Sequence, residues 1–132
     1  MIEVDVASLE DDYEHWLRFV DLCPVGIARL DEQGDTELVN PAAVRLLEPI
    51  TGPQVIDDLF AALGAHAVGL RKMVAAFTRR SGVICPTYRV YPRPSPDGKQ
   101  APGVEICLIK LAPGRLVAVI EEACPDEAQQ AA

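Results

Sequence analysis

The sequence is poor in aromatic residues and in histidine, and it contains no long apolar run. Its 132 residues include one tryptophan, three tyrosines, three phenylalanines and two histidines, His15 and His66. Two histidines are too few for a metal site that is built from several of them. Uninterrupted apolar stretches such as residues 116–120 are far shorter than the roughly 20 residues that cross a bilayer. We therefore expect neither a membrane span nor a histidine-rich metal centre.

Basic residues are also in short supply. Twelve Lys and Arg stand against twenty Asp and Glu, so the formal net charge is −8 at pH 7. A chain with this charge is repelled by nucleic acid and by anionic membrane surfaces, and we expect it to bind neither. The N-terminal residues 1–12 are acidic and lack the basic and apolar regions of a secretion signal. The expected location is the cytoplasm.

The sequence lacks the common motifs of enzymes and of zinc or redox sites. There is no glycine-rich phosphate loop, no G-x-S-x-G and no H-E-x-x-H, so we expect no catalytic activity. The four cysteines are widely spaced without a C-x-x-C pair, which argues against zinc and thioredoxin-like chemistry. An alternative is a small thiol enzyme in which Cys85 is the nucleophile and His66 the base. Nothing in the sequence supplies an orienting group or an oxyanion site for it.

The most informative stretch is residues 24–47, PVGIARLDEQGDTELVNPAAVRLL. Residues 26–30 and 36–40 read as two short strands, and the turn between them contains Gly34, which tolerates a positive φ. Asn40 is suited to cap a helix whose first residue is Pro41, where a missing N–H costs nothing. The sequence therefore predicts a β-hairpin followed directly by a helix that ends at Pro49.

An amphipathic helix is predicted before this hairpin. Its apolar residues recur at helical spacing and form one stripe, which contains Leu9, Tyr13, Trp16, Leu17 and Val20. Such a stripe either packs on its own domain or pairs with the same helix of a second subunit. We expect a homodimer, with Tyr13, Trp16, Leu17 and Val20 at its interface.

Two helices and three strands are predicted after residue 50. The helices cover residues 55–63 and 66–80, and the strands cover residues 83–91, 104–111 and 115–120. Pro86 within the first of these strands predicts a sheet edge, a bulge or a late start of the strand. The chain is thus divided into an N-terminal helix at 1–23, one domain at 24–122 and a polar tail or linker at 123–132.

This pattern resembles the PAS domain, a sensory module of bacterial signalling proteins. The resemblance is carried by Phe19, by Pro24-x-Gly26-Ile27, by Asp31-x-x-Gly34, by Val39-Asn40-Pro41-Ala42-Ala43 and by Leu46-Leu47. It implies an α+β fold with a five-stranded antiparallel sheet in the order 2-1-5-4-3 and with helices on one face. PAS domains often end in an Asp-Ile-Thr-like motif that couples the last strand to an effector. Here Ile120-Glu121-Glu122 stands in that place.

The resemblance also implies a function. We expect a sensory or regulatory domain that binds a small apolar ligand, or pairs with a second copy, to control an attached effector. The effector would be a histidine kinase, as in two-component systems, or an enzyme that makes cyclic nucleotides. A ligand-free interaction module with the same fold and a solid core is the alternative.

The site residues follow from the same resemblance. In haem-binding PAS domains a histidine from this region ligates iron, which leaves haem open at His66, although the surrounding haem motif is missing. Flavin is not expected, because no Asn-Cys-Arg-Phe-like sequence occurs. A small apolar pocket would be lined by helix residues, among them Met73 and Phe77, and by Tyr88 from the sheet. Leu59, Phe60 and Leu70 would face Ile27, Ile106 and Val117, or their neighbours, across it.

Overall fold

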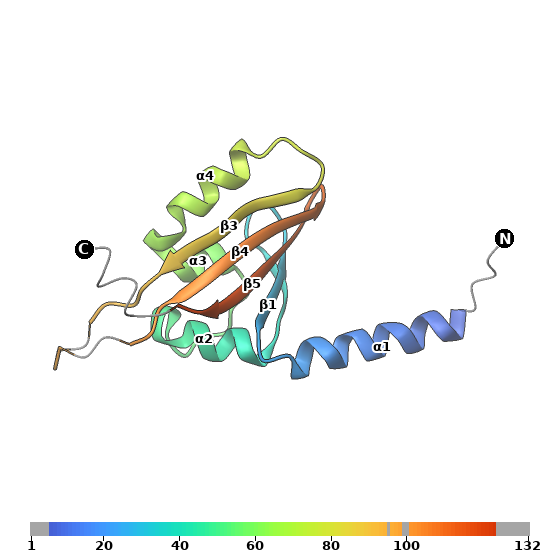
Figure 1. Cartoon of the computed structure of the whole chain (residues 1–132), viewed down its shortest axis with the longest axis horizontal. Helices are drawn as coiled ribbons and strands as arrows, with labels where there is room; N and C mark the ends of the chain where they lie inside the picture. The colour runs from blue at the N-terminus through green and yellow to red at the C-terminus, as the bar shows by residue number, and fades with distance from the viewer. Residues whose placement is uncertain (1–5, 95, 99–100, 124–132) are drawn as a thin grey trace.

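A computed structural model describes residues 6–94, 96–98 and 101–123 of the chain. The polar tail predicted at 123–132 lies outside the described residues except for Ala123. The elements in chain order are α1 (Val6–Leu22), β1 (Gly26–Leu30), β2 (Thr36–Val39), α2 (Pro41–Thr51), α3 (Leu59–Leu63), a 3₁₀ turn η1 (Gly64–Ala67), α4 (Val68–Ala76), β3 (Gly82–Val90), β4 (Val104–Ala112) and β5 (Arg115–Glu122). Figure 1 shows them along the chain.

The strands form one antiparallel sheet in the order β2-β1-β5-β4-β3, which confirms the predicted order. The centre of the sheet is regular, since β1 pairs with β5 without interruption from Gly26 opposite Ile120 to Leu30 opposite Leu116. The edges are irregular. The register of β3 against β4 shifts on either side of Cys85, next to Pro86, which cannot donate to a ladder. The sheet edge and the bulge expected at Pro86 are both present, whereas a late start of the strand is wrong, because β3 already begins at Gly82.

The hairpin between β1 and β2 is closed by its own side chains. The carboxylate of Asp31 accepts hydrogen bonds from the backbone N–H groups of Gln33 (2.9 Å) and Asp35 (3.0 Å). Gly34 has a φ of +101°, and a Cβ at this position would lie 2.6 Å from Oδ1 of Asp58. Only glycine satisfies both conditions, which is why the turn signal in the sequence was reliable here.

The helix boundaries differ from the predicted ones at the end of α2, at the start of α3 and at both ends of α4, which begins at Val68 because Gly64–Ala67 forms η1. Helix α2 continues past Pro49 to Thr51, because the Thr51 hydroxyl donates to the Leu47 carbonyl and the Gly52 N–H donates to that of Glu48. Helix α3 begins only at Leu59, where Asp58 caps it. Helix α4 ends at Ala76 instead of Arg80, since Phe77 is already extended.

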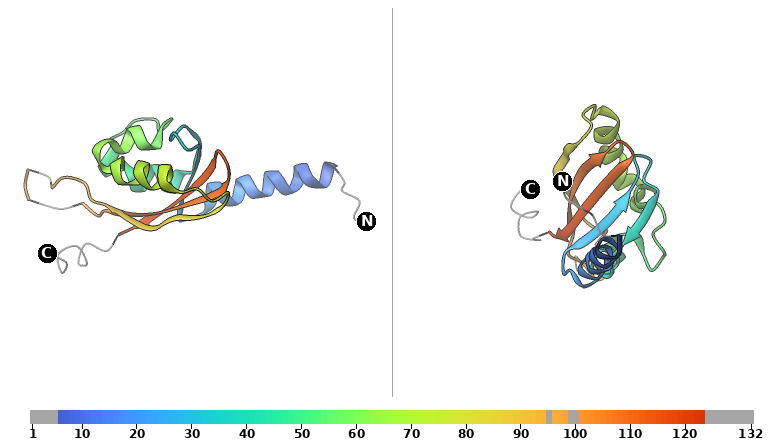
Figure 2. Two further views of the ribbon diagram at one scale, coloured as in Figure 1. Left: turned by 90° about the horizontal axis from the view of Figure 1, so that it is seen from above. Right: turned by 90° about the vertical axis from the view of Figure 1, so that its right-hand side faces the viewer.

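The core lies between one face of the sheet and the helices α2, α3 and α4, as the views in Figures 1 and 2 show. Its largest fully buried side chains come from both layers and include Phe60, Leu30, Leu47, Leu59, Leu70, Ile106, Leu108, Leu116 and Ile120. The other face of the sheet carries no helix in these views.

One stretch of the described residues, Leu59–Ala76, is long and apolar enough to cross a membrane by length and composition. It is divided here into α3, η1 and α4. Leu59, Phe60 and Leu70 are fully buried in the core. This stretch therefore forms the helical layer over the sheet.

Candidate functional site

Helix α1 projects from the body of the domain and exposes large apolar side chains. In Figures 1 and 2 it runs away from the sheet and the other helices. The exposed fractions are 53% for Tyr13, 52% for Trp16, 57% for Phe19 and 74% for Leu22. The rings of Trp16 and Phe19 stack with centroids 5.8 Å apart. We name these four side chains the α1 ridge.

The ridge follows a different line from the stripe that the sequence predicted. Its members are spaced three residues apart, so they wind around the helix. Val20, which we expected at the dimer interface, is only 3% exposed and is buried against its own domain. Leu17 is half-buried. The predicted stripe is therefore divided along the helix: Tyr13 and Trp16 remain exposed where α1 leaves the domain, whereas Val20, near the end of α1, helps to attach the helix.

Asn40 fixes this attachment. Its side-chain oxygen accepts hydrogen bonds from the backbone N–H groups of Ile27 (2.8 Å) and Ala43 (3.0 Å). Its amide nitrogen donates to the carbonyls of Val20 (2.8 Å) and Val25 (2.9 Å). The side chain is buried and uses both its oxygen and its nitrogen. One residue thus joins the end of α1, the start of β1 and the start of α2.

The sequence predicted Asn40 only as a helix cap. The cap is confirmed, because Ala43 at the third helical position donates to it. The bonds to Val20 and Val25 span 20 and 15 residues, and no local pattern reveals them. The only signal that could have pointed to them is the presence of a polar residue within a run that is otherwise apolar.

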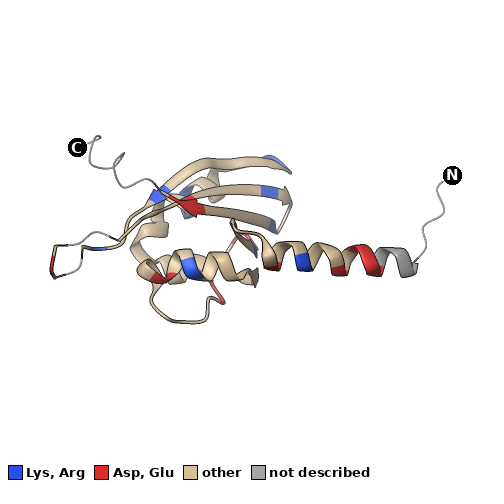
Figure 3. Ribbon diagram, turned by 60° about the horizontal axis from the view of Figure 1, so that its bottom comes forward, with Lys and Arg blue, Asp and Glu red and all other residues tan. Residues whose placement is uncertain are grey.

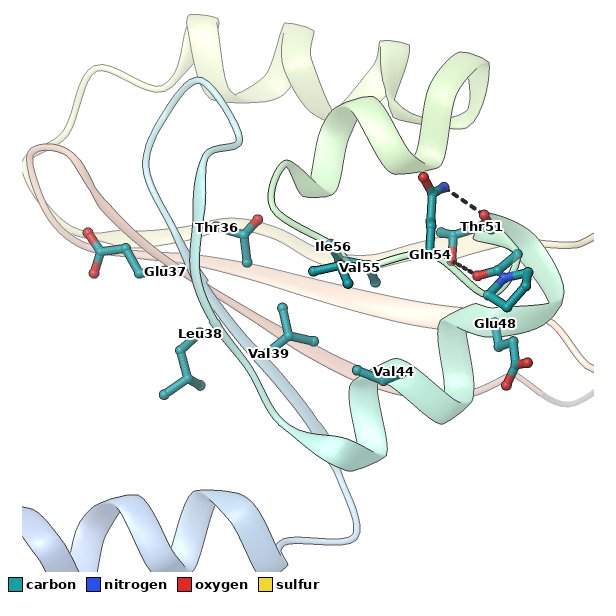
Figure 4. Close-up of a pocket in the computed structure, with 12 residues that line it drawn as sticks. Thr36, Glu37, Leu38, Val39, Val44, Glu48, Thr51, Gln54, Val55 and Ile56 are labelled. Carbon is teal, nitrogen blue, oxygen red and sulfur yellow. Dashed lines mark hydrogen bonds between the residues drawn. The ribbon is translucent and has the colours of Figure 1, made fainter.

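A groove of about 560 Å³ lies between β2, α2 and the loop before α3 (Figure 4). We name it the β2 groove. Figure 4 shows Val39 and Val44 on one side and Val55 and Ile56 opposite them. The remaining lining residues are Thr36, Glu37, Leu38, Glu48, Thr51, Gly52, Pro53 and Gln54. The groove is apolar at its centre and has a carboxylate on β2 and another on α2.

The space in which we expected a ligand is occupied by side chains. Leu59, Phe60 and Leu70 are fully buried and pack against Ile106, as predicted, but as parts of one hydrophobic cluster. Ile27 and Val117 are not among the buried core residues. Leu30, Leu116 and Ala118 face the helices in their place. Both faces of these strands carry apolar side chains, so the pattern of apolar and polar residues did not show which side chains face the helices.

The four predicted cofactor-binding residues do not line the β2 groove. The side chain of His66 is exposed in η1, and its backbone carbonyl accepts a hydrogen bond from the Tyr88 hydroxyl. Met73 is 40% exposed on α4. Phe77 lies beside the ammonium of Lys110, which is 5.9 Å from the ring centroid. The structure thus brings Tyr88 to the backbone of His66 and leaves Met73 and Phe77 elsewhere.

Cysteine and metal chemistry find little support. Cys85 is buried, whereas the imidazole of His66 is exposed on the helical layer. Burial raises the pKa of the Cys107 thiol above its usual range, which lowers its reactivity. Within residues 6–94, 96–98 and 101–123, no three His, Cys, Asp or Glu side chains gather as a metal site. The α1 ridge and the β2 groove are therefore the surfaces that the described part offers for binding.

A partly buried ion pair lies at the edge of the core. Lys110, near the end of β4, is almost buried, and its Nζ lies 2.7 Å from Oε1 of Glu32 in the β1–β2 turn. The hydrogen bond from Lys110 lowers the pKa of Glu32 below its ordinary value. This pair ties β4 to the hairpin turn.

Charged groups are unevenly distributed over the two surfaces. Figure 3 shows acidic residues along α1. Acidic side chains also line a hollow beside the β2 groove that shares Thr36 and Glu37 with it, namely Asp31, Asp35, Asp57 and Asp58. Both surfaces therefore combine exposed apolar groups with negative charge.

No family model and no curated protein matches the sequence. Solved structures do match the fold. The PAS domain of an HTR-like protein from Haloarcula marismortui is 15% identical, with a TM-score of 0.59, and the match covers 86% of this chain and 99% of that one. A domain of the sensory box sensor histidine kinase/response regulator from Geobacter sulfurreducens is 20% identical, with a TM-score of 0.54, covering 86% and 96%. With its strand order and its single helical layer, the chain has the fold of a PAS domain.

Proposed function

We propose that this chain is a regulatory PAS module of a cytoplasmic signalling protein and that it works as a pair of copies joined through α1. The effector that it controls would be attached to it, in the manner of a sensor histidine kinase. The module performs no catalysis itself. The PAS fold supports the signalling role, and the Geobacter structure, which comes from a sensor histidine kinase, supports the class of effector.

The observation that carries the proposal is the α1 ridge. Four large apolar side chains are more than half exposed on a helix that leaves the domain. Burying a side chain of this size stabilises by roughly 1.5–3 kcal/mol, so a partner for the ridge gains free energy at several positions. A second copy offers the same ridge, and two-fold pairs are the commonest assemblies. Among the acidic residues of α1, Glu14 and Asp21 lie on the side of the helix opposite the centre of the ridge, whereas Asp12 lies on the same side as Trp16 and Phe19 and remains exposed.

Asn40 provides the route from the pair to the domain. Because its side chain bonds to α1, β1 and α2 at once, a change in the direction of α1 alters the packing of β1 and of the first core helix, α2. Two directions of α1 in the pair would then favour two different states of the effector. The filled core supports regulation through partner contacts more than through a deeply buried cofactor.

A small ligand is the second candidate, and the β2 groove supports it. Its volume of about 560 Å³ lies within the range of ligand pockets, and it combines apolar walls with the polar groups of Thr36 and Thr51. A ligand that binds the folded state raises the midpoint of thermal unfolding. An unchanged midpoint across a panel of metabolites would favour the ligand-free interaction module.

The pairing is tested by light scattering on the variant Trp16→Glu/Phe19→Glu. The wild-type protein should have twice the polypeptide mass of 14.3 kDa, and the variant should fall to 14.3 kDa, because two carboxylates then lie in the contact. Val68→Glu is the matched control, since Val68 is 51% exposed on α4. A wild-type protein that stays at 14.3 kDa at every concentration would refute the pairing, and so would a double variant that remains dimeric.

A further inference from the structure

We infer that the β2 groove is a docking site for an extended, basic segment of a partner protein, which would lie along β2 with apolar side chains between β2 and α2. The inference does not depend on the pairing of α1. It rests on the shape of the surface, on the second half of the edge strand β2, which the loop before α3 does not cover, and on the charges around both.

The surface is long and continuous, as an extended chain requires. The β2 groove shares Leu38 and Val39 with a second hollow, which is lined by Leu17, Val20 and Asp21 from α1. It shares Thr36 and Glu37 with the acidic hollow on its other side. The three hollows follow β2 from α1 to the loop before α3.

The strand beside the groove is at the edge of the sheet. Its first half is covered, because the Thr36 N–H donates to the Asp57 carbonyl and Asp35 forms a bridge with Asp58. Its second half is different. The Asn40 N–H donates to the Ile27 carbonyl, and Leu38 lies opposite Arg29. In an antiparallel pair of strands, residues that are hydrogen-bonded to the neighbouring strand alternate with residues that are not. The N–H and C=O of Val39, between Leu38 and Asn40, therefore point away from β1. An added strand pairs with groups of this kind.

The apolar contacts of the groove are available to a partner. Val55 is 90% exposed and Val44 is 46% exposed, and Figure 4 shows both beside the space that Val39 and Ile56 also line. Side chains of an extended chain alternate, so every second residue of the partner would reach these valines.

The charges select a basic occupant. Acidic residues surround the three hollows, namely Asp21, Asp31, Asp35, Glu37, Glu48, Asp57 and Asp58, whereas Arg18 is the basic residue that lines them. Glu37 already pairs with Arg29, at 3.1 Å, but both side chains are well exposed, so the carboxylate remains accessible to a second cation. The net charge of −8 adds a long-range attraction for cations. The chain's own terminal segments, residues 1–5 and 124–132, carry acids and no Lys or Arg, so they are poor occupants.

The test is a titration of the ¹⁵N-labelled protein with a blocked seven-residue peptide of alternating lysine and valine, followed by amide chemical shifts. We expect shifts at Val39, Thr51 and Val55. A peptide with glutamate in place of lysine should bind about ten-fold more weakly or worse, a difference of about 1.4 kcal/mol. Proline at the centre of the lysine peptide should also weaken binding, because it removes a ladder donor.

Variants locate the site. Val55→Lys should weaken binding of the lysine peptide about ten-fold, through lost apolar contact and like charge, and Val68→Lys on α4 should leave it unchanged. Both side chains are exposed, so both variants should fold. The inference is overturned if the groove amides do not shift, if the glutamate peptide binds equally well, or if Val55→Lys binds like the wild type. Groove shifts that appear on raising protein concentration without peptide would assign the surface to a second copy and overturn it too.

Discussion

At the scale of single residues, Asn40 is the most consequential polar group of the fold. Polar side chains are costly to bury unless they are hydrogen-bonded, and Asn40 has four such bonds to three elements. An amide is the only side chain of this size that both accepts from two N–H groups and donates to two carbonyls. The identity of this residue therefore decides whether α1 is held in one direction.

Two substitutions separate its roles. Asn40→Ala removes the cap and leaves buried backbone groups without partners, so we expect a loss of about 2–4 kcal/mol in the free energy of unfolding. Asn40→Asp keeps the acceptor for Ile27 and Ala43 but sets a carboxylate oxygen against the carbonyls of Val20 and Val25. The Asn40→Asp variant should retain most of the stabilisation by the helix cap, and α1 should no longer be held against the domain. Urea unfolding measures the first effect, and amide exchange of α1 measures the second.

The account of Asn40 would be contradicted by equal protection of α1 in Asn40→Asp and in the wild type. The matched control is Gln54→Glu in the exposed loop before α3, which makes the same change from amide to carboxylate on a side chain that donates to the Thr51 carbonyl. This control should leave both measurements unchanged.

At the scale of elements, ionic and hydrogen-bonded ties hold the strands in place at the ends of the sheet. Lys110 of β4 reaches the turn between β1 and β2 through Glu32. Because the pKa of Glu32 is lower in the folded chain than in the unfolded chain, protonation favours unfolding. The stabilisation by this pair is complete above a pH of about 4.5 and is lost as the pH falls through the folded value.

This tie gives a pH-dependent prediction. The midpoint of urea unfolding of Glu32→Gln should lie below that of the wild type at pH 7, and the two should converge as the pH falls below 4.5 and the carboxylate of Glu32 in the folded chain is protonated. Glu48→Gln on α2 is the control and should show no such convergence, since Glu48 is exposed. A difference between Glu32→Gln and the wild type that is constant from pH 7 to pH 3 would show that the carboxylate does not stabilise the fold.

At the scale of the whole molecule, the order of the elements was predictable and the use of their surfaces was not. Turn glycines, the Asn40-Pro41 cap and Pro86 are local signals, and they predicted the hairpin, the start of α2 and the irregular edge strand correctly. The sequence did not predict which side chains of β1 and β5 face the core, because Ile27 and Val117 are as apolar as their buried neighbours. Which part of the predicted apolar stripe of α1 remains exposed depends on the burial of Val20, which is a contact between distant parts of the chain.

The central claim is that α1 pairs with α1 of a second copy, and the protein carries its own reporter for it. Trp16 is the single tryptophan, and it is 52% exposed in one copy. The most direct measurement is its emission spectrum across protein concentration. We predict a shift to shorter wavelength as copies pair and the indole leaves water. Val68→Glu should show the same shift and Phe19→Glu a weaker one. An emission maximum that stays at the wavelength of a hydrated indole at every concentration would contradict the claim.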